Sequence, residues 1–204
     1  MNIYNLILGS PFIYNKIRPL VIGGIDQSSL YRTLDAAEQD VVLDVGCGTG
    51  DALNYLSKFR QYWGFDIDNI AVSYAKNRFG AMGNVVFRTK LIDRNDIEEI
   101  KPTRVVLAGL LHHLTDGEVT SLFSMLKIAS GLHKIVTQDI VYLPGELVSN
   151  FFAHLDRGRF CRKQDEYEGL VRSSGLDVVS SSIVRSHPKN GRAKYLIMTI
   201  EVKR

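Results

Sequence analysis

The sequence has few cysteines, no long uncharged apolar run and little net charge, and the first two scarcities already exclude several kinds of protein. Its two cysteines, Cys47 and Cys161, are far apart and form no C-x-x-C pair, so neither a disulfide framework nor a zinc site is indicated. A reducing cytoplasm is the simplest setting. The first fifteen residues lack charge, but Pro11 interrupts them and Lys16 and Arg18 follow, before the roughly twenty apolar residues of a spanning helix accumulate. We therefore expect no membrane span, and without a basic start a signal peptide is not favoured.

Charge and composition are those of a packed globule. The formal net charge is only +3, and 45% of the residues are hydrophobic, which suits a soluble core. Residues 156–204 hold eleven Lys and Arg against six Asp and Glu. A mildly basic last quarter is usually a solvated surface, so nucleic acid is not favoured as a partner. Because the 204 residues contain no linker or internal repeat, we expect residues 1–204 to form a single domain.

Short apolar strand segments alternate with helical segments from residue 41 onward. This alternation predicts an α/β fold, in which helices cover both faces of a mainly parallel sheet. The five expected parallel strands are Val41 to Val45, Tyr62 to Phe65, Val85 to Phe87, Val105 to Leu107 and Lys134 to Gln138. Residues 178–184 and 194–202 predict a C-terminal antiparallel hairpin, whose reversal at Asn190-Gly191 would use positive φ angles. The sheet should therefore have seven strands.

Apolar residues at helical spacing predict the helices. Leu53 and Leu56 mark one helix, residues 71–79 a second, and residues 119–126 a third that begins with a capping box of Thr115 and Glu118. After the fifth strand, a further apolar stripe is formed by Val148, Phe151, Phe152 and Leu155.

Residues 1–36 predict a helical cap on the domain. They hold two apolar stretches separated by Gly23-Gly24. The second has Asp26 as its expected N-cap and places Leu30 and Leu34 on one face together with Ala37.

The most informative stretch joins a buried strand to a glycine-rich turn and a helix, over residues 41–51. Glycine is needed where the backbone bends sharply and lies against a ligand, because a Cβ there would collide with it. An acidic residue follows about 20 positions later, as nucleotide-binding crossovers require. That acid is Asp66, which could accept hydrogen bonds from both ribose hydroxyls, with Ile67 against an adenine face. The competing interpretation, that Asp66 caps the next helix, is less favoured because Asp68 and Asn69 are better placed for that.

The glycine spacing separates two classes of adenosine ligand. Dinucleotide enzymes use G-x-G-x-x-G, whereas this turn reads G-x-G-x-G and has Asp51 where the third glycine would stand. A carboxylate there would repel a diphosphate. Asp44 and the N–H groups of the turn suit a ligand with adenosine at one end and a zwitterionic amino acid at the other, which describes S-adenosylmethionine (SAM).

The stretch Leu43-Asp44-Val45-Gly46-Cys47-Gly48-Thr49-Gly50, with Gly64-Phe65-Asp66-Ile67-Asp68, resembles the first two motifs of the class I SAM-dependent methyltransferases. The later topology is similar over residues 41–204. The resemblance implies a Rossmann-like methyltransferase fold and SAM as the cofactor. The residues it assigns to the cofactor are Asp44, Gly46, Cys47, Gly48, Gly50, Asp66, Ile67 and Ala108.

The sequence departs from that family after the third strand. Many relatives carry an acidic residue there to hold the adenine amino group, and this chain reads Thr89-Lys90-Leu91-Ile92-Asp93. Asp93 stands a residue or two late for that role, and Leu91 and Ile92 are apolar alternatives for contacting the adenine.

Few catalytic residues are expected, because the sulfonium of SAM already activates its methyl group and the protein mainly aligns the acceptor. Ligands of open α/β sheets lie beyond the carboxyl ends of the strands, which places residues 108–113 beside the methyl group. A histidine with a pKa near neutrality suits a general base. His113 is the preferred candidate and His112 the second, while local packing of either ring is an equally weighted alternative.

In this fold the acceptor is recognised by the N-terminal cap and by the segment after the fifth strand. The candidate acceptor-binding residues are Tyr14, Tyr31, Tyr142, His154 and Arg157. The aromatic cap suits a lipophilic or aromatic small molecule, although such side chains are more often core. Arg157 could bind an acidic acceptor or pair with Asp156.

Two absences narrow the subclass. No Asn/Asp-Pro-Pro-aromatic turn of DNA amino methyltransferases follows the fourth strand. Leu110 and Leu111 stand where metal-dependent relatives place carboxylates, and Asp139 alone is available after the fifth strand, so we predict no metal.

Three rival functions stay open. The first, an RNA methyltransferase, would use the basic last quarter but lacks an appended module of stacking aromatics. The second is a non-catalytic SAM-binding protein. The third, an NAD-dependent oxidoreductase, is disfavoured by Asp51 and the shortened glycine spacing.

Overall fold

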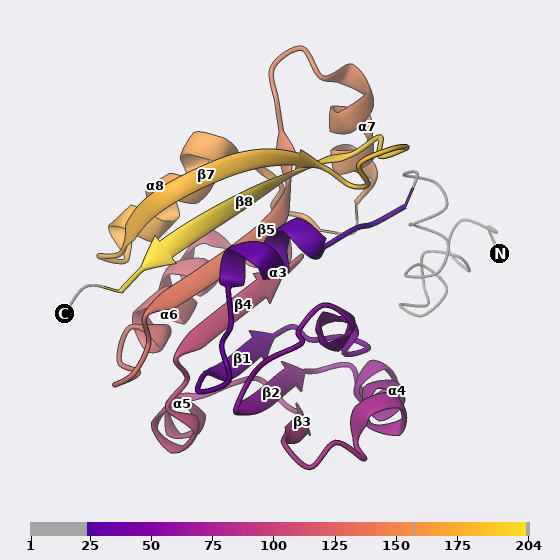
Figure 1. Ribbon diagram of the computed structural model, residues 1–204. Helices are drawn as coiled ribbons and strands as arrows, with labels where there is room; N and C mark the ends of the chain where they lie inside the picture. The colour runs from indigo at the N-terminus through magenta and orange to yellow at the C-terminus, as the bar shows by residue number, and fades with distance from the viewer. Residues whose placement is uncertain (1–23, 157, 203–204) are drawn as a thin grey trace, which may run out of the picture.

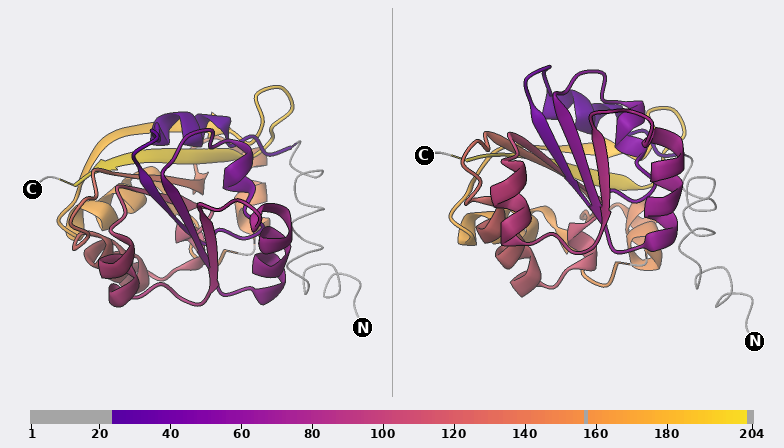
Figure 2. Two further views of the ribbon diagram at one scale, coloured as in Figure 1. Left: turned by 60° about the horizontal axis from the view of Figure 1, so that its bottom comes forward. Right: turned by 90° about the horizontal axis from the view of Figure 1, so that it is seen from below.

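A twisted sheet runs through the middle of the protein, with helices on both of its faces (Figures 1 and 2). The computed structural model describes residues 24–156 and 158–202. The strand order is β3-β2-β1-β4-β5-β8-β7, and the short β6 pairs with β5 beside this path. The bounds are β1 Val41–Val45, β2 Gln61–Asp66, β3 Val85–Thr89, β4 Arg104–Ala108, β5 Lys134–Tyr142, β6 Arg162–Lys163, β7 Asp177–Arg185 and β8 Lys194–Glu201.

The first five strands are parallel and the last two are antiparallel, as the sequence predicts. β8 pairs antiparallel with β5, and β7 pairs antiparallel with β8. The predicted count of seven strands omits the two-residue β6, because a segment so short carries no apolar periodicity. The sheet reverses its strand order at β1, between β2 and β4, and in open α/β sheets the crevice at such a point holds the ligand.

The helices differ from the prediction in three places. Their bounds are α3 Ser28–Leu34, α4 Asn69–Phe79, α5 Arg94–Ile100, α6 Asp116–Leu126, α7 Leu147–Leu155 and α8 Gln164–Ser173, with short 3-10 turns η1 Asp51–Asn54 and η2 Leu111–His113. The helix expected around Leu53 and Leu56 is only the turn η1, and α5 was not expected. Gln27 is the N-cap of α3 and not Asp26, although Asp26 Oδ1 accepts from the N–H of Ser28. The capping box of Thr115 and Glu118 is confirmed at α6.

Alternating strand residues build two cores. One face of the sheet packs against α5, α6 and α8, through side chains such as Leu43, Phe123 and Tyr167. The other face packs against α3 and α4, through side chains such as Leu34 and Tyr62. Burial of both faces explains why the central strands read as continuous apolar runs and not as alternating patterns.

The hairpin turn differs from its predicted chemistry. Neither Asn190 nor Gly191 has a positive φ, because residues 186–193 form a wide loop and not a two-residue reversal. A Cβ on Gly191 would instead collide with the backbone of His187, so this glycine allows two backbone segments to approach closely.

Candidate functional site

The turn after β1 forms a backbone cradle at the carboxyl end of the sheet. Gly46, Gly48 and Gly50 have φ angles of +79°, +51° and +75°. Residues other than glycine rarely adopt such positive φ angles. The N–H groups of Gly46 and Cys47 both donate to the carbonyl of Phe65, at 2.8 and 3.0 Å. These bonds anchor the start of the turn to the end of β2.

Asp66 joins this turn to the next crossover. Its Oδ2 accepts from the N–H of Gly48 at 2.8 Å, and its Oδ1 accepts from the N–H of Asp68 at 2.9 Å. Asp68 caps α4 by accepting from the N–H groups of Ile70 and Ala71, so Asp66 is not the helix cap. Each carboxylate oxygen of Asp66 keeps a second lone pair, with which it could accept a ribose hydroxyl.

The cradle has room for a cofactor at its centre. A Cβ built on Gly48 would meet no described atom within 4 Å, whereas one on Gly46 would lie 3.2 Å from the side chain of Leu110. One glycine is therefore required for packing and the other borders open space. The open side of the turn fits the backbone approach that SAM needs.

Asp44 lies beneath the cradle. It is buried, its Oδ2 accepts from the hydroxyl of Tyr62 at 2.6 Å, and its Oδ1 has no hydrogen-bond partner among the described residues. Burial raises the pKa of Asp44 to about 7, against the opposing effect of the Tyr62 hydrogen bond. An unpartnered acceptor at this depth fits a ligand that brings an ammonium group.

Cys47 packs its thiol inward, where a Cβ on Gly64 would lie 2.9 Å from Sγ. Burial raises the pKa of this thiol. Only the backbone of Cys47 therefore faces the cradle.

The predicted adenine residues divide into two groups. Ile67 and Leu91 are 69% and 76% exposed, so both side chains are accessible to a flat aromatic ligand. Ile92 packs against the core below α5. Asp93 is the N-cap of α5 in a capping box with Asp96, which gives it a structural role. Ala108 ends β4 and is half-buried.

Asp51 does not stand as an isolated negative charge. It pairs with Arg78 at 2.6 Å, and its repulsion of a diphosphate is correspondingly weaker than the sequence suggests. The spacing of the glycines remains the stronger distinction between the two cofactor classes.

His112 and His113 lie in η2, directly after β4, in different surroundings. His112 is fully buried, whereas His113 is exposed, and their ring centroids are 4.2 Å apart. The Nδ1 of His112 is 2.8 Å from Asp139 Oδ1, and its Nε2 is 3.1 Å from Asp156 Oδ1. His112 therefore bridges β5 and the C-cap of α7.

The surroundings of His112 favour the protonated, positively charged form of its ring at neutral pH. Burial alone would lower the pKa of His112, but the hydrogen bonds and charges of Asp139 and Asp156 outweigh it and raise the pKa to about 9. An imidazolium shared by two carboxylates is a buried ion cluster, and the loss of one partner from such a cluster is strongly destabilising.

Arg162 braces the same turn from the other side. Its guanidinium donates to the carbonyls of Leu111 and Leu114, and it forms an ion pair with Asp116 at 2.6 Å. The carbonyl of His112 accepts from the N–H of Phe160 at 3.0 Å. The segment after α7 thus holds η2 in place, and with it the exposed ring of His113.

The sequence interpretation missed the roles of Asp139, Asp156 and Arg162. Asp156 pairs with His112, and Arg162 is buried within the basic quarter that was read as solvated surface. The available signal was the density of charged residues from Asp156 to Lys163, directly after the apolar stripe of α7.

The predicted acceptor residues do not form one cluster. Tyr142 ends β5 beside Ala153 and Phe152 of α7, where burial raises its pKa. His154 is exposed in the last turn of α7. Tyr31 is buried in α3 and stacks on Tyr55, with centroids 5.2 Å apart. Tyr14 and Arg157 lie outside the described residues.

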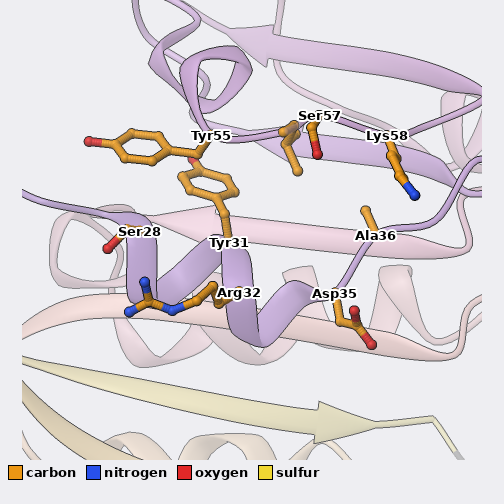
Figure 3. Close-up of a pocket in the computed structure, with 9 residues that line it drawn as sticks. Ser28, Tyr31, Arg32, Asp35, Ala36, Tyr55, Ser57 and Lys58 are labelled. Carbon is orange, nitrogen blue, oxygen red and sulfur yellow. The ribbon is translucent and has the colours of Figure 1, made fainter.

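Tyr31 and Tyr55 belong to a separate hollow of about 320 Å³ between α3 and residues 55–58 (Figure 3). Its charged lining residues are Arg32, Asp35 and Lys58. None of the glycines of the cradle lines this hollow, so Tyr31 contributes to a different surface from His113.

One group of side chains in the described ranges has the spacing of a metal site. His112, His113 and Asp156 bring ligand atoms within 4.8 Å of one another. In the protonated ring of His112, the nitrogen facing Asp139 and the nitrogen facing Asp156 each carry a proton, so neither has a lone pair for a metal. The absence of a metal stays a prediction.

Comparison with known proteins agrees with this site. The family model of a methyltransferase domain matches residues 42–129, which include the cradle, Asp66 and both histidines. No curated protein matches the sequence.

Several solved structures share the fold. The BH2331 protein of Bacillus halodurans C-125 is 11% identical, with a TM-score of 0.66 over 88% of this chain and 99% of that chain. Geranyl diphosphate methyltransferase in complex with SAM is 14% identical, with a TM-score of 0.63 over 87% and 84%. Magnesium protoporphyrin IX methyltransferase from Synechocystis PCC 6803 with bound SAH is 18% identical, with a TM-score of 0.59 over 85% and 83%.

Residues 42–129 match a methyltransferase domain, and the described chain has the fold of SAM-dependent methyltransferases. SAM is its cofactor, and its reaction is methyl transfer. None of the helices that the structure describes has the length and apolar content to cross a bilayer.

Proposed function

We propose that this methyltransferase modifies a small lipophilic or aromatic molecule, with His113 as the general base. The observation that carries the proposal is the contrast at the end of β4, where His112 is fixed in a buried ion cluster and the adjacent His113 ring is exposed. A base must reach the proton of its substrate, and only the exposed ring is able to do so.

The chain's own residues would perform three tasks. Asp66 and the cradle hold the cofactor, whose sulfonium supplies an activated methyl group when bound. The braced turn η2 presents His113 at a fixed position, which lowers the entropic cost of aligning the acceptor. A ring nitrogen of His113 would accept the proton that the acceptor atom loses when it is methylated.

The acceptor class is inferred from the surface beside the histidines. Tyr142 and α7 adjoin Asp156, and four apolar side chains of α7 are exposed. Two proteins of the same fold are methyltransferases of geranyl diphosphate and magnesium protoporphyrin IX, both large and partly apolar acceptors. These two enzymes support the proposal because their fold is the same and their acceptors are of this kind.

The number of Lys and Arg residues in the last quarter overstates the case for RNA as the acceptor. Arg162 is buried, Arg172 pairs with Glu168 at 2.6 Å, and Lys194 pairs with Glu146. Fewer cations are left to bind phosphates. We place the reaction in the cytoplasm because the chain has only two, widely separated cysteines.

The test is a transfer assay with methyl-labelled SAM and fractionated cell extract. We expect label in the organic-soluble small-molecule fraction, and about 10²-fold less or lower with the variant His113→Ala. Label in RNA would replace the proposal with the RNA alternative. No label in any fraction, together with SAM binding in calorimetry, would favour a non-catalytic SAM-binding protein.

A further inference from the structure

β7 forms one edge of the sheet (Figure 1). Among the described strands it pairs only with β8. It is nine residues long, six of these residues are exposed and none is buried. A long edge strand presents a row of backbone N–H and C=O groups with which another strand can pair. β7 therefore offers a surface for strand addition.

The features that usually protect an edge strand are scarce in β7. Residues 178–184 contain no charged residue and no proline, although lysine, proline and inward-pointing charges are common devices against pairing. A β-bulge is another such device, and one lies near the start of the strand, between Val178 and Ser180. The register with β8 is unbroken from Ser180 to Arg185, so most of the edge is regular.

The sequence of β7 is complementary to itself in the antiparallel direction. When a second copy is reversed about Ser181, acid meets base, aliphatic residues meet aliphatic residues and serine meets serine. The pairs are Asp177 with Arg185, Val178 with Val184, Val179 with Ile183, Ser180 with Ser182, and Ser181 with its own copy. A two-fold axis through Ser181 makes each of the unlike contacts twice, as a symmetric dimer requires. This pattern favours a second copy of the chain over an unrelated peptide.

The exposure of the side chains agrees with such a partner. Val179 and Ile183, which would meet across the axis, are 46% and 38% exposed. Asp177 and Arg185, at the two ends of the strand, are also exposed. Opposite charges that face each other on neighbouring strands stabilise the pair, and like charges destabilise it. At the centre, Ser181 donates its hydroxyl to Glu168 of α8 at 2.7 Å, so this small side chain needs no partner from the second copy.

We propose that two copies of this chain associate by antiparallel pairing of β7 with β7, about a two-fold axis at Ser181. The two sheets then form one continuous sheet. Because of the bulge, the backbones pair most closely over residues 179–183, and the long side chain of Arg185 reaches Asp177 of the second copy. Pairing of two strands buries less than the roughly 1,600 Å² of a standard interface, so we expect a transient dimer with a dissociation constant on the order of micromolar.

Charge reversal tests both the pairing and its direction. In sedimentation velocity at about 100 µM, above the expected dissociation constant, the wild type should show a species with twice the 22.9 kDa mass of one chain. Asp177→Arg and Arg185→Asp should each weaken the dimer about tenfold, because either variant brings like charges together at both ends of the strand pair. An equimolar mixture of the two variants should dimerise within about twofold of wild type, because opposite charges then meet again. A monomeric wild type would overturn the proposal, and so would a mixture that dimerises no better than the single variants.

Two isoleucines with matched exposure separate β7 from other surfaces. Ile183 is 38% exposed, and Ile128, two residues after α6, is 39% exposed. Ile183→Lys should weaken the dimer at least about tenfold, because lysine on an edge strand opposes pairing. Ile128→Lys should leave the dimer unchanged, and both variants should keep the circular dichroism spectrum of the wild type. Equal dimerisation of the two variants would overturn the pairing. None of these measurements uses SAM or an acceptor, so a failure of the proposed reaction would leave them intact.

Discussion

The cofactor side and the acceptor side of this protein are built by different means. The cofactor side is held by backbone N–H groups that donate to the carbonyl of Phe65 and to the carboxylate of Asp66, all within residues 44–68. The acceptor side depends on buried charges that join residues up to 51 positions apart, such as Arg162 and Leu111. The first side therefore depends mainly on local backbone geometry, whereas the second requires contacts between distant segments. We therefore expect changes on the two sides to have separable effects.

The largest expected effect is on the cofactor side. Gly48→Val should abolish SAM binding, because a branched side chain would occupy the open centre of the cradle and the φ of +51° disfavours it. Calorimetry should detect no binding, with the circular dichroism spectrum unchanged.

Gly145 provides the matched control. It also has a positive φ, of +77°, and a Cβ there would meet no described atom within 4 Å. Gly145→Val imposes a similar backbone strain on the acceptor side and should retain SAM affinity. Loss of binding in both variants would attribute the effect to strain and not to the cradle.

The next effect concerns turnover. His113→Ala should lower kcat by about 10² to 10⁴ with SAM affinity nearly unchanged, because a general base acts in the transition state. If the variant keeps normal turnover per folded molecule and the same pH profile, His113 is a packing residue.

The third effect is on stability and comes from the buried cluster. His112→Ala leaves Asp139 and Asp156 without their cation and should cost roughly 3 to 5 kcal/mol of unfolding free energy. Denaturant titration measures this loss. His133→Ala, at an exposed histidine, is the control and should change stability little.

The same cluster predicts a pH dependence. The folded-state pKa of His112, about 9, lies above the ordinary value of 6.5. Its contribution to stability is therefore complete below pH 6.5 and is lost as the pH rises through 9. The wild type should lose more stability over this interval than His112→Ala, and parallel curves would contradict the charged bridge.

The smallest effect is again on the cofactor side. Asp66→Ala should weaken SAM binding by more than tenfold, since it removes hydrogen bonds to a charged acceptor worth roughly 1.5 to 3 kcal/mol. Part of that loss would come from the turn itself, which Asp66 holds through the N–H of Gly48. Calorimetry showing unchanged affinity would remove Asp66 from the cofactor site.

The sequence predicts the elements whose signals are local. The central strands, the capping box at Thr115 and the glycine turn depend on neighbouring residues, and the structure has them within a few positions of their predicted bounds. The hairpin was also predicted, but the conformation of its turn was not, because Asn190-Gly191 favours positive φ only in a two-residue reversal. Here the connection is a longer loop, which does not require positive φ angles at Asn190 and Gly191.

The sequence does not predict which distant residues meet. His112 was expected as a second base, yet its partners Asp139 and Asp156 are 27 and 44 positions away and make it a buried cation. The apolar side of α7 is a second example. The spacing of apolar residues predicts that the helix has an apolar side, but it does not predict whether that side faces the core or the solvent. Ser149 fixes that direction through a bond to Lys194, 45 positions away, and Asn150 through bonds to the nearer Leu143.

The separation between the cofactor side and the acceptor side is tested most directly by the dissociation constant of SAM. It should be measured in four proteins: wild type, Asp66→Ala, His113→Ala and the double variant. We expect Asp66→Ala to weaken binding more than tenfold, His113→Ala to leave it unchanged, and the double variant to match Asp66→Ala. Independent sites give such additivity. A comparable loss of affinity in His113→Ala, or a double variant that differs from Asp66→Ala, would contradict the separation of the two sides.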